Sequence, residues 1–341
     1  MPAKKAPLHP LVKRLTLTKD DIRWATPASI AEHRAKRLRC KVIADLGCGA
    51  GFQAFAFAKQ CKKVYAVEKD EEKLDLAKEN AQHLGITNII FILGDVLDEH
   101  VRKQVKDSNI VFCDPTRLPE ERSRSMSTIQ PDLQQLFNVY TAITKDIAIE
   151  FPPQMRTENI LFDGEKEYLS LDGKLNRLTL YCGSLKKNET SAVVLPEQAV
   201  LFTTEATKSL PSTPRSTEEQ GQFVYEVNPA VTKAELLAEL SKKTATSCLC
   251  IGKRTLFTSQ HLVESPFFCS TYQVVAVVPF KEGKIINELK KFHAGSVTLR
   301  CSIPPEEYWK VRRRYEAQLS GQKKITLFEW NGKALLVEKV V

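Results

Sequence analysis

The sequence predicts an α/β fold built on a largely parallel sheet, followed by a smaller second α/β domain. Three observations carry this prediction. A glycine-rich loop separates an apolar run from a helical pattern, short β-type runs ending in acidic residues alternate with helices, and the pattern restarts after a polar stretch in mid-chain. Strands that alternate with helical segments indicate βαβ units and therefore a parallel sheet.

A glycine loop follows the first expected strand. An apolar run ends in Asp45, and three alternate glycines follow it at Gly47, Gly49 and Gly51. Glycine suits a loop in which the backbone turns sharply and a ligand comes close. The helix expected after the loop offers free N–H groups at its N-terminus. The dinucleotide-binding fingerprint needs its third glycine three residues after the second, where this chain has Phe52.

Further β-type runs also lead into carboxylates. Three of them end at or just before Glu68, Asp95 and Asp114, and a separate run spans residues 147–150. In parallel sheets, ligands bind at the carboxyl ends of the strands. We expect Glu68 to accept hydrogen bonds from a vicinal diol and Asp95 to accept one from an adenine amino group. Asp45 is expected to lie close to an ammonium group.

The later elements follow from turn residues and periodicity. Asp172-Gly173 predicts a hairpin between two late strands of the first sheet. The stretch after residue 203 is rich in Thr, Ser, Pro and Glu, which is typical of a linker or mobile loop. Beyond it we expect a helix at 230–240, a strand at 272–278, a helix at 285–292, a strand at 296–301, a helix at 305–319 and a hairpin at 325–337 turning at Asn331-Gly332.

The chain is therefore expected to contain four parts. These are a basic helical segment at residues 1–39, the glycine-loop domain at 40–203, a linker or mobile loop at 204–221 and a second domain at 222–341.

The spacing from Asp45 to Gly51 resembles motif I of the class I S-adenosylmethionine (SAM) methyltransferases. A helix opened by Thr26-Pro27 precedes it, and Asp114-Pro115 follows the fourth strand. From about residue 18 onward, this order is similar to that of class I methyltransferases with a THUMP-like C-terminal domain, a family of predicted RNA methylases. The resemblance implies a Rossmann-like methyltransferase sheet, a THUMP-like second domain, SAM as cofactor and an RNA substrate. It implies cofactor binding by Asp45, Gly47, Cys48, Gly49, Gly51, Glu68, Lys69, Asp95, Val96 and Asp114.

Composition excludes several classes of protein. The 341 residues are 43% apolar but contain no run of eighteen apolar residues, so no membrane span is expected. The N-terminus lacks the apolar core of a signal peptide. Nine cysteines without a pattern favour a reducing compartment, and no set of cysteines and histidines has the spacing of a metal site. We expect a cytoplasmic monomer without a metal ion.

The net charge of +9 is unevenly distributed. Residues 1–39 carry +7 and residues 281–341 carry +6, which leaves −4 for the residues between them. Two basic flanks suit a polyanion that is gripped outside the active site, so RNA is the expected partner, with tRNA favoured. The arginines expected to contact it are Arg34, Arg37, Arg122, Arg124, Arg312, Arg313 and Arg314.

Methyl transfer is an in-line displacement, in which the protein chiefly aligns the nucleophile and excludes water. The expected catalytic residues are Asp114, Pro115 and Arg117, and Phe151 is a candidate to stack on the target base. Asp114 would orient an amine, which favours a base nitrogen such as that of guanine. Two alternatives stay open: a methyltransferase for a small molecule or protein, and a catalytically silent RNA-binding protein with a vestigial cofactor fold.

Overall fold

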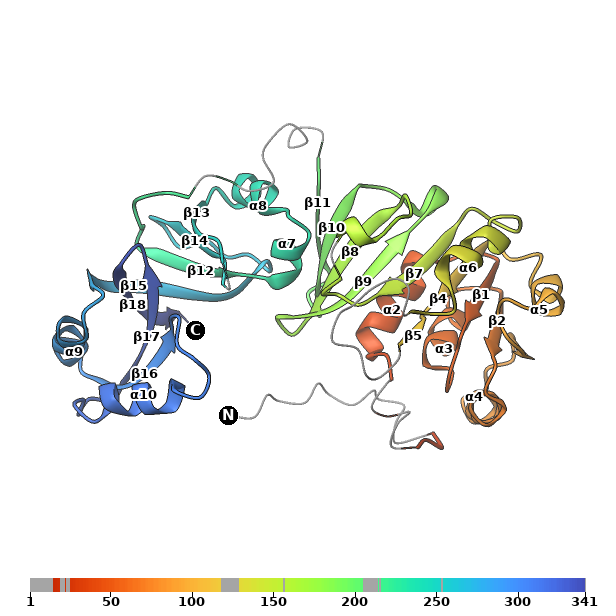
Figure 1. Ribbon diagram of the computed structural model, residues 1–341, viewed down its shortest axis with the longest axis horizontal. Coiled ribbons are helices and arrows are strands. Elements are labelled where there is room, and N and C mark those ends of the chain that lie inside the picture. The colour runs from red at the N-terminus through yellow and green to blue at the C-terminus, as the bar shows by residue number, and fades with distance from the viewer. Residues whose placement is uncertain are drawn as a thin grey trace. The chain divides into compact units, whose positions relative to one another are not determined.

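The computed structural model of the protein describes residues 15–18, 22, 25–117, 129–155, 157–204, 214, 216–252 and 254–340. The chain divides into two compact units, Met1–Thr203 and Thr204–Val341. Each unit contains its own sheet with helices packed against it (Figure 1).

The first unit is built on nine strands in the order β11-β10-β8-β9-β7-β4-β1-β2-β3. Strands β3, β2, β1, β4 and β7 are parallel to their neighbours in that series, whereas β9 runs antiparallel to both β7 and β8. The strands are β1 (Val42–Leu46), β2 (Lys63–Glu68), β3 (Ile89–Leu93), β4 (Ile110–Cys113), β7 (Ile147–Phe151), β8 (Glu165–Leu171), β9 (Lys174–Tyr181), β10 (Thr190–Leu195) and β11 (Ala199–Phe202). The predicted α/β fold class, with its largely parallel sheet, is confirmed.

One helix precedes β1, and four others lie between successive parallel strands of this sheet. They are α2 (Ala28–Arg37), α3 (Phe52–Ala58), α4 (Glu71–His83), α5 (Glu99–Gln104) and α6 (Leu133–Tyr140). Helix α2 has Pro27 as its N-cap, so the helix expected to open at Thr26-Pro27 is present. Helices α2 and α3 share a buried core with the sheet that includes Ala35, Phe57 and Phe112. This packing sets both helices against the central strands.

A short two-stranded ribbon follows β4 in the chain. It pairs β5 (Thr116–Arg117) with β6 (Ile129–Gln130) in antiparallel fashion. The ribbon fixes the backbone directly after Asp114-Pro115.

The second unit contains seven strands in the order β13-β14-β12-β15-β18-β17-β16. Its elements are β12 (Phe223–Val227), α7 (Pro229–Lys233), α8 (Leu237–Thr244), β13 (Ser247–Cys250), β14 (Leu256–Ser259), β15 (Phe268–Pro279), α9 (Glu282–Lys291), β16 (Ala294–Arg300), α10 (Tyr308–Glu316), β17 (Lys323–Trp330) and β18 (Lys333–Val340). The smaller second domain with helices and a sheet is confirmed. The single helix expected at 230–240 is instead two helices, because Glu235 takes a left-handed conformation (φ 58°) between them.

Both predicted hairpin turns are present. Asp172 and Gly173 have φ values of 50° and 69°, and Asn331 and Gly332 have 48° and 69°. Two successive positive φ values are typical of the tight turns that match the twist of paired strands. These turns join β8 to β9 and β17 to β18.

Candidate active site

The glycine loop is held at the carboxyl ends of β1 and β2. The backbone N–H groups of Gly47 and Cys48 both donate to the carbonyl of Val67, at 2.8 and 2.9 Å. The Gly49 N–H donates to Oε2 of Glu68 at 2.9 Å. The loop is thus tied to β2 by its backbone, which leaves its path fixed before any ligand binds.

All three loop glycines have positive φ, but they differ in what surrounds them. The values are 85° for Gly47, 52° for Gly49 and 89° for Gly51. A Cβ on Gly51 would lie 2.5 Å from the Phe55 ring, so this glycine lets α3 pack. A Cβ on Gly49 would meet no atom within 4 Å. Gly49 therefore borders open space at the point where the loop meets α3.

Asp45 lies beneath this loop and is fully buried. Its Oδ2 has no hydrogen-bond partner among the described residues. The pKa of Asp45 is raised to about 8, chiefly by burial and in addition by Asp114 and Glu68, whereas Arg34 lowers it. Because a buried carboxylate without a partner is costly, this oxygen is suited to receive a cationic group from a ligand.

The next two strand ends present Glu68 and Asp95. Oε1 of Glu68 accepts from the N–H groups of Lys69 and Asp70, at 3.0 and 3.1 Å, so this side chain is held in one orientation. Asp95 is exposed, and its Oδ1 accepts from the Leu97 N–H at 2.9 Å. The buried Val96 is fixed through its carbonyl, which accepts from the Tyr140 hydroxyl at 2.7 Å. These predicted cofactor residues line consecutive strand ends.

The register of the central strands brings Asp45 and Asp114 to one face of the sheet. Asp45 of β1 pairs with Phe112 of β4, and Cys113 of β4 pairs with Ile149 of β7. Because side chains alternate along a strand, the next position on that face in β4 is Asp114, which is half-buried. Pro115 after it is buried.

The cysteines near this edge are not activated thiols. Burial raises the pKa of both Cys48 and Cys113 well above the ordinary value, and neighbouring carboxylates raise it further. The thiolate is the nucleophilic form of cysteine, so neither of these two thiols is suited to a covalent mechanism.

Arg34 and Arg37 do not lie where the sequence led us to expect them. Arg34 is 2% exposed and pairs with Glu150, and Arg37 pairs with Glu165 at 2.7 Å and with Glu167. A guanidinium that is buried against carboxylates cannot hold a phosphate on the surface. The predicted RNA contact of these two arginines is corrected to an internal role.

The other predicted arginines divide into two groups. Arg122 and Arg124 lie outside the described residues, as does the side chain of Arg117. In α10, Arg313 is exposed, Arg312 contacts Glu316 at 2.9 Å, and Arg314 contacts Glu282 at 2.9 Å. Helix α10 thus presents cations beside Trp309, which is 50% exposed.

Three features of the site were missed or misplaced from the sequence. Phe151 is only 1% exposed, so in this structure it cannot stack on a base. Gln53 and Glu150, which contact Arg34, were not singled out. Glu165 and Glu167 alternate in β8 ahead of the apolar Tyr168 and Leu169, and this was the available signal for buried cationic partners, because alternate residues share one face.

The sequence predicted neither a membrane span nor a metal site, and only the described residues can be compared with that prediction. Among these residues no helix is both long and apolar enough to cross a membrane. Nor do three or more His, Cys, Asp or Glu side chains of those residues gather as a metal site would require.

Comparisons with known proteins agree with this fold. A family profile described as a methyltransferase domain matches residues 39–149. An uncharacterized SAM-dependent methyltransferase of Mycobacterium tuberculosis is 26% identical over 178 residues, which cover 51% of this chain and 48% of that protein. An uncharacterized RNA methyltransferase of Clostridium tetani is 32% identical over 97 residues, which cover 27% of this chain and 21% of that protein. The chain spans less than half the length of these relatives.

A solved structure resembles the chain over nearly its whole length. The crystal structure of a candidate methyltransferase from Porphyromonas gingivalis W83 has a TM-score of 0.79, covers 95% of this chain and 83% of its own, and is 19% identical. At this identity the similarity shows a shared fold. The family match, the strand order and the glycine loop coincide in the first unit. Residues 39–149 are therefore similar to a methyltransferase domain, and this match lies in the unit that contains the glycine loop.

Proposed function

We propose that the protein is a SAM-dependent methyltransferase that modifies RNA, specifically tRNA at a guanine nitrogen, with its second, THUMP-like unit as the RNA grip. The observation that carries the SAM part is the buried, unpartnered Oδ2 of Asp45 beneath a loop that borders open space at Gly49. A ligand meets both conditions if it carries a cationic group for the carboxylate and if its remaining atoms fit against the glycine backbone. The ammonium end of SAM is such a group.

The remaining strand ends suit the rest of the cofactor. Glu68, fixed by two backbone N–H groups on one oxygen and one on the other, still has lone pairs for the ribose hydroxyls. The exposed Asp95 and the fixed backbone at Val96 would hold the adenine. Gly47, Cys48, Gly51 and Lys69 contribute the loop and strand-end backbone against which the cofactor would lie.

The chemistry requires alignment more than acid or base strength. SAM, when bound, supplies an electrophilic methyl group. Asp114 and Pro115 lie at the end of the central strand β4, and Asp114 shares a sheet face with Asp45. A carboxylate only accepts hydrogen bonds, and guanine offers both N1–H and an amino group along one edge, so Asp114 can orient that edge and exclude water. Arg117 would lie beside the target nucleotide.

The support for RNA comes from charge and from relatives. Trp309, Arg312, Arg313 and Arg314 place an exposed aromatic ring among cations on α10, and the Arg312 guanidinium lies 5.4 Å from the Trp309 ring centre. Stacking rings and cations are the groups that proteins use on RNA. Two relatives described as RNA methyltransferases are 32% and 40% identical to this chain over 97 and 77 residues.

The direct test supplies SAM with a deuterated methyl group to the full chain together with total tRNA. Nucleosides are then analysed by mass spectrometry, and a parallel reaction contains cell protein and small metabolites in place of RNA. We expect the heavy methyl group on guanosine. Label on protein or on a small molecule, with none on RNA, would favour the alternative substrate classes and reject the RNA proposal.

Asp45 makes SAM affinity depend on pH. Below its pKa of about 8 the carboxyl holds a proton that must leave before an ammonium group can pair with it. Affinity is therefore expected to fall as pH decreases from 8 to 6, by more than about tenfold, since one proton is released on binding. Calorimetry across that range measures the effect.

The control for this pH dependence is Asp45→Asn. The amide cannot release a proton, so its weaker SAM binding should not decline further towards pH 6. A wild-type dissociation constant that is flat from pH 8 to 6 would show that Asp45 does not pair with the cofactor.

Replacing Arg312, Arg313 and Arg314 together by glutamine is expected to weaken RNA binding without changing SAM affinity. Each lost phosphate contact should flatten the slope of log affinity against log salt by about 0.7–0.9. Filter binding of tRNA at several salt concentrations measures that slope. The matched control replaces the exposed Lys233, Lys242 and Lys243 of α7 and α8 by glutamine. Equal slopes for the two triple variants would show that α10 is not part of the RNA-binding surface.

A further inference from the structure

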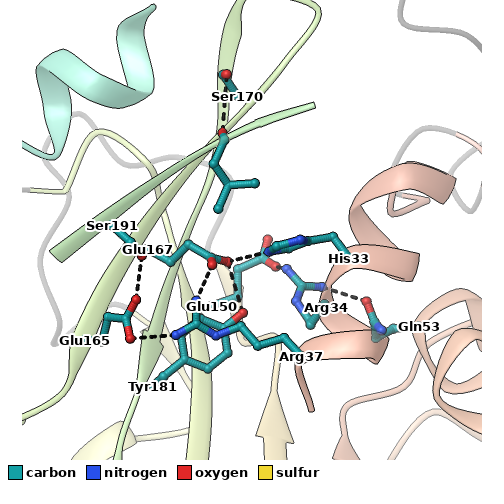
Figure 2. A network of polar contacts seen from close by, with 11 residues as sticks. His33, Arg34, Arg37, Gln53, Glu150, Glu165, Glu167, Ser170, Tyr181 and Ser191 are labelled. Carbon is teal, nitrogen blue, oxygen red and sulfur yellow. Dashed lines mark hydrogen bonds and ion pairs between the residues drawn. The ribbon is translucent and has the colours of Figure 1, made fainter. Parts of the chain in front are cut away.

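Helix α2 sends basic side chains into the interior of the first unit, where they meet buried carboxylates (Figure 2). His33, Arg34 and Arg37 contribute to this network, and Arg34 is the most deeply buried of the three. Arginine is almost never fully buried unless it is paired. The partners of Arg34 therefore indicate what its burial accomplishes.

Arg34 connects three elements. Its Nη1 donates to Oε1 of Gln53 at 2.8 Å, and its Nη2 donates to Glu150 near the end of β7. Gln53 is the second residue of α3, and its Nε2 donates to the Ala31 carbonyl of α2 at 3.3 Å. Oε1 of Glu150 also contacts Nε of Arg177 at 2.5 Å. The start of α3, directly after the glycine loop, is thus fastened to α2 and to β7.

The same guanidinium lies on the sheet face that carries the acids of the site. Its central carbon is 4.7 Å from the centre of the Phe112 ring. Phe112 pairs with Asp45, and Asp114 is the next residue of β4 on that face. Burial opposes the charge on Arg34, but Glu150, Tyr181, Asp114 and Glu167 together raise its pKa. Arg34 in turn lowers the pKa of Asp45.

Arg37 anchors α2 independently of Arg34. It pairs with Glu165 and Glu167, and its guanidinium lies 3.7 Å from the centre of the Tyr181 ring. Oε1 of Glu167 also accepts from Tyr181 at 3.1 Å and contacts Nε2 of His33 at 3.1 Å. These contacts attach α2 to β8 and β9. Docking of the helix therefore does not depend on Arg34 alone, and the two arginines can be compared.

We propose that Arg34 is a positioning residue of the methyl-transfer site. Through Gln53 and Glu150 it fixes the start of α3 and the end of β7, and its buried positive charge favours ionisation of Asp45, so that the carboxyl can release its proton to pair with an incoming ammonium group. This inference rests on the SAM-binding role proposed above. It assigns α2 a function in cofactor binding, although Arg34 itself reaches neither solvent nor substrate.

Several charged or titratable groups surround this pair. Asp114 and Glu68, like burial, raise the pKa of Asp45, and Arg34 is the cation that lowers it. The groups that act on Asp45 or Arg34 from the surrounding elements are Glu68 of β2, Asp114 of β4, Glu150 of β7, Glu167 of β8, Tyr181 of β9, and the thiols Cys48 and Cys113. Arg177 of β9 contacts Glu150, and His33 and Arg37 of α2 contact Glu167, so these three lie beyond the carboxylates.

The test uses Arg34→Met in the full chain, with Arg37→Met as the matched control. Glu150 keeps Arg177 as a partner in the first variant, and Glu167 keeps Tyr181 and His33 in the second. The carboxyl of Asp45 is titrated in the free protein by carbon-13 NMR, and its signal is identified by its loss in Asp45→Asn. In Arg34→Met we expect the titration midpoint to rise by about one pH unit or more, the size typical of losing a close opposite charge. Arg37→Met should leave it unchanged.

SAM calorimetry at pH 7 gives the second measurement. Arg34→Met should bind SAM roughly tenfold more weakly, the expected result of a one-unit rise in the Asp45 midpoint, whereas Arg37→Met should bind it as the wild type does. An Asp45 midpoint that is equal in the two variants would overturn the inference, whatever their thermal stabilities. If wild type binds SAM and the midpoint does not move, the proposed cofactor role stands and the role of Arg34 fails. If the midpoint moves but wild type does not bind SAM, the proposed function fails.

Arg34→Lys separates the two parts of the inference and replaces Arg34→Met if that variant does not fold. Lysine keeps a positive charge but loses the planar fork that contacts Gln53 and Glu150 together. We expect an Asp45 midpoint close to that of wild type and a weaker SAM affinity. Wild-type affinity in Arg34→Lys would show that the connection between α3 and β7 contributes nothing to the site.

Discussion

Gly49→Leu is expected to abolish SAM binding while the protein stays folded. Gly49 has a φ of 52°, and no atom lies within 4 Å of a Cβ built on it. A leucine there costs only about 1–2 kcal/mol of backbone strain, yet its side chain would fill the space in which we propose that the cofactor binds. Calorimetry should show SAM affinity reduced roughly a hundredfold or more, equivalent to at least about 2.7 kcal/mol.

Gly85→Leu is the matched control for this substitution. Gly85 has a φ of 67°, and a Cβ there would also meet nothing within 4 Å, but it follows α4 and not the loop. The two variants should lose similar amounts of thermal stability, and only Gly49→Leu should lose SAM. Normal SAM binding by Gly49→Leu would mean that the glycine loop is not the cofactor site.

Features with local sequence signals were predicted well. The glycine loop, the acids after successive strands and the two hairpins each depend on a few neighbouring residues. Glycine and Asx residues mark positive φ, as at Asp172 and Gly173, and apolar runs mark buried strands. The carboxyl ends of parallel strands meet at one edge, so a strand order is enough to bring Asp45 and Asp114 together.

The buried network could not be predicted in the same way. Arg34 and Glu150 are separated by 116 residues, and His33 and Glu167 by 134. A helix with several cations is usually a solvated face, and nothing within α2 reveals that two strands, β7 and β8, present carboxylates to it. Arg34 and Arg37 were expected to contact RNA, but they pair with carboxylates that are distant in the sequence and therefore have internal roles.

The break between α7 and α8 has a similar origin. The apolar spacing at 230–240 suits one helix, but the left-handed Glu235 allows Ala230 and Val231 as well as Leu237 and Leu240 to be buried. Only tertiary packing favours such a conformation for a residue with a side chain, because φ values above zero are strained outside glycine.

Asp114→Asn is expected to remove most methyl transfer and to leave SAM binding intact. If Asp114 orients the target amine or takes its proton, the rate at saturating SAM should fall by about 10²–10⁴-fold, as for other positioned acid–base groups. The measurement combines heavy-methyl transfer to tRNA with calorimetry of SAM. A wild-type rate in this variant would show that the reacting atoms do not lie at the end of β4.

Asp114→Asn is also expected to change SAM affinity, and the direction of that change can be measured. Asp114 raises the pKa of Asp45, so removing its charge should lower that pKa and strengthen SAM binding slightly at pH 7. The matched variant is Asp95→Asn, which changes the exposed acid after β3. It should weaken SAM binding and keep the rate at saturating SAM. Opposite effects of two amide substitutions at different strand ends of the same sheet would separate chemistry from cofactor retention, because a general loss of folding would lower both quantities in both variants.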